Sequence, residues 1–211
     1  KGEDKHFRAM RSINCRGKIL TFDQPKIMGI VNITPDSFYE GSRNQSVKEV
    51  LATVDKMLQE GADILDLGGF STRPGAKQIS NQDEIQRIAP YVKSIIQHFP
   101  EAVISVDTFR LDVAKAAADE GAVIINDVSF ASDSKLIKFC AENQIPYVLM
   151  HMRGTPLDMM ENTQYENVVV DVFRELQSKL ITLQNEGLND VIIDPGFGFS
   201  KTIEQNYDLM R

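Results

Sequence analysis

The sequence predicts an α/β protein in which buried parallel strands alternate with helices. Three segments share one pattern, in which Glu-Gly ends a helix and a short apolar run then stops at an acidic residue: EGADILD (60–66), EGAVIIND (120–127) and EGLNDVIID (186–194). These runs are too short for helices and do not alternate, so they are expected to be strands buried on both faces. A polar side chain ends nearly every such run: Asn32, Asp66, Asp107, Asn126, His151 and Asp194. An open sheet focuses its ligand at one switch point, whereas a barrel gathers the ends of many strands around one pocket, so the pattern favours a (β/α)8 TIM barrel.

The expected elements follow one another in regular order. Six strands are predicted, at residues 26–33, 62–67, 102–107, 122–127, 146–152 and 190–196. Helical stripes of apolar residues lie between them, at 46–60, 83–99, 109–120, 134–143 and 165–186. Ser46 and Glu49 are expected to form a capping box at the first helix, and Pro90 to kink the second. The chain ends at Arg211, in a helix that follows the sixth strand.

A complete barrel needs eight β/α units, and the sequence supplies about six. We therefore expect residues 26–211 to form a barrel that lacks its last two units. Residues 1–25 are expected to be a leader, with a short strand pair that caps the barrel.

Composition limits the classes of function. The 211 residues are 42% hydrophobic and 25% charged, which suits one globular domain or at most two small ones. The formal net charge of −7 argues against a nucleic acid as the main partner. No apolar run reaches the roughly 18 residues of a membrane helix, and the charged N-terminal segment is unlike a secretory signal. Cys15 and Cys140 lie far apart, which excludes a zinc ribbon or a disulfide framework, so a cytoplasmic location is expected.

Two loops after the first strands carry candidate ligand-binding residues. NITPDSF (32–38) places Asn32 where its oxygen could ligate a hard cation such as Mg²⁺, although the segment could equally be a turn. GGFSTRPGA (68–76) offers Thr72 and Arg73 to an anion, with Pro74 stiffening the loop. A surface loop with an exposed arginine is the alternative interpretation.

The later strand ends carry two carboxylates and an amide, namely Asp107, Asn126 and Asp194. The two negatively charged carboxylates would repel a phosphate, but the three groups together could bind a flat heterocycle with several N–H donors. Each taken singly could instead be a helix cap or a buried hydrogen-bonding centre. Met150 could be an apolar floor under such a ring or ordinary core, and His151 is expected to be structural. Walker A, GxGxxG and GxSxG motifs are absent from the sequence.

Six motifs taken together, in this order, resemble dihydropteroate synthases, the folate-pathway enzymes that sulfonamides target: MGIVNITPDSF, DLGGFSTRPGA, SVDT, IINDV, LMHMRG and DPGFGFSK. The resemblance implies a homodimeric TIM barrel that joins 6-hydroxymethyl-7,8-dihydropterin pyrophosphate to p-aminobenzoate with Mg²⁺. It implies that Asn32 ligates Mg²⁺, and that the pterin is bound by Asp107, Asn126, Asp194, Met150 and Val128. It also implies that the p-aminobenzoate side is formed by Thr72, Arg73, Pro74 and Phe199. Arg73 and Asp107 would be the catalytic residues.

The chain departs from this family at two places. Phe70 stands where the family usually has Glu. The anion-binding residues that the family carries on strands seven and eight are missing, so this chain alone is expected to lack much of the anion site and could itself be inactive. Two alternatives stay open: a corrinoid-dependent methyltetrahydrofolate methyltransferase, which has no use for STRPG, and a non-catalytic pterin-binding paralogue.

Overall fold

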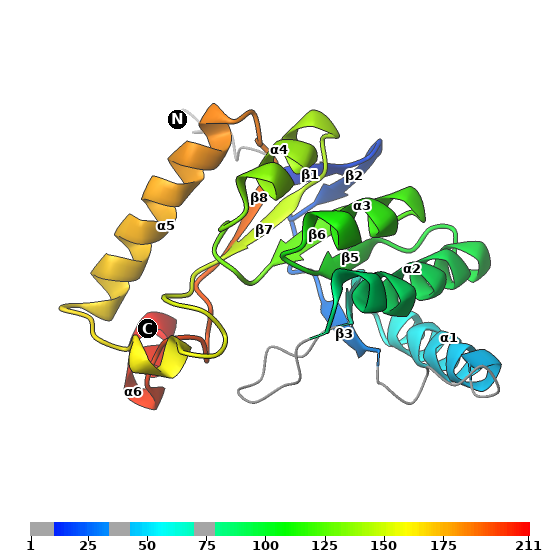
Figure 1. Ribbon diagram of the computed structural model, residues 1–211, viewed down its shortest axis with the longest axis horizontal. Helices are drawn as coiled ribbons and strands as arrows, with labels where there is room; N and C mark the ends of the chain where they lie inside the picture. The colour runs from blue at the N-terminus through cyan, green and yellow to red at the C-terminus, as the bar shows by residue number, and fades with distance from the viewer. Residues whose placement is uncertain (1–10, 34–42, 70–78) are drawn as a thin grey trace, which may run out of the picture.

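The computed structural model describes residues 11–33, 43–69 and 79–211 (Figure 1). Six parallel strands form one sheet in the order β3-β4-β5-β6-β7-β8. Their bounds are β3 (Met28–Asn32), β4 (Ile64–Gly68), β5 (Ile104–Asp107), β6 (Ile124–Asp127), β7 (Tyr147–Met150) and β8 (Val191–Asp194). Every crossover leads to the adjacent strand without the reversal that marks a doubly wound sheet. The six predicted strands are confirmed, and they are wound as in a barrel.

Helices connect the strands and cover one face of the sheet (Figure 1). They are α1 (Arg43–Gln59), α2 (Asn81–His98), α3 (Leu111–Asp119), α4 (Ser134–Glu142), α5 (Val168–Asn185) and α6 (Ile203–Met210), with the 3-10 turn η2 (Met159–Glu161) before α5. None of the helices in the described ranges is long and apolar enough to cross a membrane.

Two details of the helix starts differ from the sequence prediction. Helix α1 begins at Arg43, three residues before the predicted cap Ser46, so the predicted capping box is wrong. A capping box does occur at α2, where the Ser80 side chain accepts from the Asp83 backbone N–H and the Asp83 carboxylate accepts from the Ser80 backbone N–H. Apolar periodicity located both helices but not their first turns, because caps depend on local hydrogen bonds rather than on burial.

Alternation along the strands separates the helix-covered face from the inner face of the partial barrel. On β4, Leu65 and Leu67 pack among residues of α1 and α2, while Ile64 faces inward. The same parity makes Val103, just before β5, and Ile124 and Val148, near the start of β6 and β7, inner residues. The inner face is therefore apolar where the strands begin.

A hairpin covers this apolar layer. Strands β1 (Ser12–Cys15) and β2 (Lys18–Thr21) pair antiparallel, and Ile13 and Cys15 are buried against the inner residues of the sheet. The backbone N–H of Asn14 donates to Asp190 Oδ2 at 3.0 Å, and Arg16 Nη1 donates to the Ala118 carbonyl at 2.6 Å. The N-terminal ends of the strands are thus closed, and a ligand would reach the inner face from their C-terminal ends.

Candidate functional site

The polar strand-end residues fall into two groups according to the parity of each strand. Asn32, Asp66, Asp107, Asn126 and Asp194 continue the inner-facing positions, each an even number of residues from an inner apolar residue. Asp127 and His151 have the opposite parity and lie on the helix side. Asp127 is buried, where it accepts hydrogen bonds from the Ser129 backbone N–H at 2.6 Å and from the Tyr147 hydroxyl.

Asn126 has its amide orientation set by a neighbouring carboxylate. Its Nδ2 donates to Asp66 Oδ2 at 3.0 Å, and the Asp66 side chain is buried. An ionised carboxylate can only accept, so the Asn126 NH2 group faces Asp66 and Oδ1 is the atom left for a ligand. Burial raises the pKa of Asp66, while the bond from Asn126 acts in the opposite direction. A ligand at this point needs an N–H donor.

Asp107 lies at the same strand ends, next to Gly68. A Cβ added to Gly68 would lie 3.8 Å from Asp107 Oδ2 and 3.7 Å from Asn32 Oδ1, so the glycine leaves space between these two oxygens. Burial raises the pKa of Asp107 well above its usual range, and the nearby carboxylates Asp66, Glu84 and Asp127 add to the rise. A ligand that presents N–H donors would relieve this crowding of acceptors.

The apolar site residues form one cluster at the same end of the barrel. Val128, Met150 and Met152 are buried together, and Phe199 packs against them. Met150 pairs in register with Asp194, so the predicted floor of the ring site and a predicted acceptor are neighbours. The structure therefore brings together Asp107, Asn126, Asp194, Val128, Met150 and Phe199, while Asn32 lies exposed at the end of β3.

Three predicted residues cannot be placed in this arrangement. Thr72, Arg73 and Pro74, and with them Phe70, lie outside the described residues. In the described ranges there is no group of three or more His, Cys, Asp or Glu side chains that could hold a metal ion.

Sequence reasoning missed two buried charged residues next to the site. Glu84 on α2 accepts from Thr108 Oγ1 and from Arg110 Nη1, each at 2.8 Å. Lys201 is buried behind the 195–200 loop. Charged residues are rarely buried without partners, but a single sequence does not reveal burial, so only the place of Lys201 within DPGFGFSK could have indicated it.

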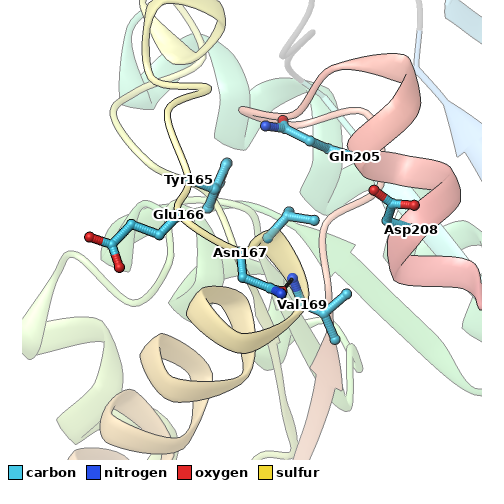
Figure 2. A pocket seen from close by; sticks show the side chains of 7 residues that line it. Tyr165, Glu166, Asn167, Val169, Gln205 and Asp208 are labelled. Carbon is cyan, nitrogen blue, oxygen red and sulfur yellow. Dashed lines mark hydrogen bonds between the residues drawn. The ribbon is translucent and has the colours of Figure 1, made fainter.

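A separate hollow lies between the start of α5 and α6. It measures about 430 Å³ and is lined by Tyr165, Asn167, Gln205 and Asp208, among others (Figure 2). It contains none of the predicted site residues. Its polar lining includes the carboxylates of Glu166 and Asp208, and it is not the candidate site.

Comparison with known proteins agrees with this geometry. Residues 28–211 match the family described as pterin binding enzyme. Dihydropteroate synthase of Escherichia coli (strain K12) is 39% identical over 197 residues, which cover 92% of this chain and 70% of that protein. The mitochondrial folate synthesis bifunctional protein of Arabidopsis thaliana is 44% identical over 87% of this chain, which spans only 34% of that protein.

Solved structures show the same relationship. Dihydropteroate synthase of Xanthomonas albilineans with 4-aminobenzoic acid superposes with a TM-score of 0.84 at 37% identity, over 95% of this chain and 72% of that one. The Yersinia pestis enzyme in complex with a sulfonamide drug gives a TM-score of 0.85 at 36% identity, over 95% of this chain and 73% of that one. The family match over residues 28–211 and the identity to dihydropteroate synthases show that the chain belongs to the pterin-binding enzyme family.

Proposed function

We propose that this chain is a major part of a dihydropteroate synthase, a transferase of folate biosynthesis. It would condense 6-hydroxymethyl-7,8-dihydropterin pyrophosphate with p-aminobenzoate to give 7,8-dihydropteroate and pyrophosphate. One observation carries the proposal beyond the similarity: Asp107, Asn126 and Asp194 lie on the inner face with their acceptors at one end of the barrel, beside the apolar side chain of Met150. The pterin ring has an apolar face and an edge with several N–H donors, which matches this set.

The residues of the chain would bind and orient two substrates. Asp107, Asn126 Oδ1 and Asp194 accept from the N–H donors of the pterin edge, with Val128 and Met150 against the ring. The bond between the pterin methylene and the pyrophosphate oxygen breaks, and its electron pair leaves with pyrophosphate. The amine nitrogen of p-aminobenzoate bonds to the methylene, and the proton that it loses passes to water. The carboxylate of Asp107 favours the positive charge that develops on the pterin.

The p-aminobenzoate side of the site rests on fewer described residues. Phe199 would be its apolar wall, close to Met150 in the same cluster. Thr72, Arg73 and Pro74 would complete it, and Arg73 would act with Asp107 in catalysis. Holding the amine in line with the leaving group is itself a large contribution to rate, so no covalent intermediate is needed.

Magnesium is compatible with the residues present. Asn32 offers a neutral oxygen at the open end of β3, on the same side of Gly68 as a carboxylate oxygen of Asp107. Hard oxygen donors of this kind suit Mg²⁺, which keeps several waters and binds substrate phosphates. When bound, the ion would supply positive charge to the leaving pyrophosphate. Asn32 would be its ligand from this chain.

We also propose that the enzyme is a cytoplasmic homodimer, as the family resemblance implies. Helix α6 has exposed apolar side chains at Ile203, Tyr207 and Met210, which supports packing of this helix against another protein surface. Analytical ultracentrifugation of the full-length protein tests the dimer.

Pyrophosphate release tests the activity. The full-length protein is assayed with the pterin pyrophosphate and Mg²⁺, with and without p-aminobenzoate, and again after chelation with EDTA. Release that requires p-aminobenzoate and falls in Asp107→Ala or Asp194→Ala supports the proposal. The exposed Asp55→Ala is the control. Pterin binding without release would indicate a non-catalytic paralogue, and turnover that requires a corrinoid would indicate a methyltransferase.

A further inference from the structure

Lys201 is a charged side chain held entirely by acceptors of the protein. It is 2% exposed. Its Nζ lies 3.0 Å from the Gly196 carbonyl oxygen, 2.9 Å from that of Phe199 and 3.3 Å from that of His151, and 3.1 Å from His151 Nδ1. An ammonium has three N–H donors, so these four acceptors use all of its capacity.

The backbone geometry of the loop depends on this close approach. Gly196 has φ +70° and lies so near the end of β7 that an added Cβ would be 2.0 Å from the His151 carbonyl oxygen. Ser200 also has positive φ, at +49°, and its Oγ accepts from the Arg153 backbone N–H at 3.0 Å. Residues 196–200 are therefore docked on residues 151–153, and Lys201 Nζ joins the two segments.

The same ammonium determines the tautomer of His151. Because it can only donate, His151 Nδ1 must accept, and the ring proton resides on Nε2. His151 Nε2 then donates to Glu175 Oε2 on α5, at 2.9 Å. Glu175 also accepts from Arg153 Nε at 3.1 Å. The network thus extends from the loop through β7 to α5.

Lys201 contacts the loop that carries Phe199, on the p-aminobenzoate side of the site, rather than the strand that carries Asp194, on the pterin side. Asp194 is placed by the pairing of β8 with β7, which does not involve Lys201. Residues 196–199 follow the strand, and Lys201 binds the carbonyl groups at both ends of this segment. Phe199, whose carbonyl is one of them, packs on the apolar cluster of Val128 and Met150.

We infer that Lys201 is a positioning residue that fixes the 196–199 loop and thereby places Phe199 for p-aminobenzoate. The inference rests on the proposed synthase function. It predicts that loss of the ammonium weakens use of p-aminobenzoate much more than use of the pterin substrate.

The test is steady-state kinetics of the full-length enzyme with Lys201→Met, which keeps an unbranched side chain and removes the donors. The expected result is a rise of about tenfold or more in KM for p-aminobenzoate, with KM for the pterin pyrophosphate changed less than about threefold. Lys138→Met is the matched control, because Lys138 is 69% exposed and forms an ion pair with Glu142 on the same helix, at 3.8 Å. Its two KM values should match the wild type.

Two further measurements separate positioning from a merely structural role. Nitrogen-15 NMR of His151 should report the Nε2–H tautomer in the wild type and an altered Nδ1 signal in Lys201→Met. Lys201→Gln, which retains two N–H donors on a shorter side chain, should lie between wild type and Lys201→Met, and it replaces Lys201→Met if that variant does not fold. A lower melting temperature with both KM values unchanged would overturn the inference. Absence of condensation in the wild type would instead refute the synthase function itself, and the inference with it.

Discussion

The turn after β8 contains two glycines with similar backbone conformations but different space around an added Cβ, and substituting each gives a sharp test of the site geometry. Gly196 and Gly198 both have positive φ, at +70° and +82°. An alanine costs about 1 kcal/mol at either position for its backbone conformation alone. At Gly198 an added Cβ would have no heavy atom within 4 Å, whereas at Gly196 it would lie 2.0 Å from the His151 carbonyl oxygen.

The expected magnitude follows from this contact. A carbon–oxygen contact is comfortable at about 3.3 Å, so Gly196→Ala must displace the loop from β7 by roughly 1.3 Å. Overpacking of this kind costs about 1–3 kcal/mol in addition to the conformational cost. Gly196→Ala should therefore destabilise the fold by about 2–4 kcal/mol, against about 1 kcal/mol for Gly198→Ala.

Urea denaturation of both variants, followed by circular dichroism, measures the two losses. Because the backbone cost is shared, their difference isolates the contact between the loop and β7. Equal losses in the two variants would refute the close docking of Gly196 on His151. The displaced loop carries Phe199, so Gly196→Ala should also raise the KM for p-aminobenzoate more than Gly198→Ala does.

Three other predictions follow from the buried charges. Burial lowers the pKa of Lys201 from 10.5 to about 8. Between pH 8 and pH 10.5 the folded protein therefore binds fewer protons than the unfolded chain, so the unfolding free energy that this group contributes rises with pH. The unfolding free energy of wild type relative to Lys201→Met should thus rise by at most about 3 kcal/mol from pH 7.5 to 10.5 in denaturation experiments, and a pH-independent difference would contradict this. Asp107→Asn removes one of several crowded carboxylates, so at pH 8 it should raise the melting temperature by a few degrees. The same variant should weaken pterin binding, measured by calorimetry, about tenfold or more. A lower melting temperature would argue against the crowding. Glu84→Gln removes a buried negative charge that accepts from both Thr108 and Arg110, and it should cost about 3 kcal/mol in urea denaturation. The exposed Glu142→Gln should cost under about 0.5 kcal/mol.

The strands were predictable because their signal is local. Runs such as ADILDL and AVIIND contain consecutive apolar residues, Ile64 and Leu65 in the first and residues 122–125 in the second, since both faces of a barrel strand are covered near its start. The helix boundaries were less predictable, as α1 shows by starting at Arg43 rather than after Ser46. Its apolar stripe indicates which face is buried but not which residue begins the first turn.

The candidate site was only partly predictable. Asp107, Asn126 and Asp194 could be named because each ends a predicted strand, and parallel strands bring such ends to one side. The role of Asp66 in orienting Asn126 could not be named, since 60 residues separate the two and only the sheet makes them neighbours.

The sequence by itself determined the order of strands and helices, the face of each helix that is buried, and the motifs of the family. These properties depend on short-range periodicity and on residue types, both of which can be read directly from the amino-acid sequence. The tertiary structure alone decided which strand-end residues face inward, because shifting the start of a strand by one residue reverses its parity. It placed His151 and Asp127 on the helix side and Asp66 on the inner side, although all three look alike as polar residues at strand ends. It also buried Lys201, whose acceptors come from residues 151 to 199 and meet only when β7 and β8 pair.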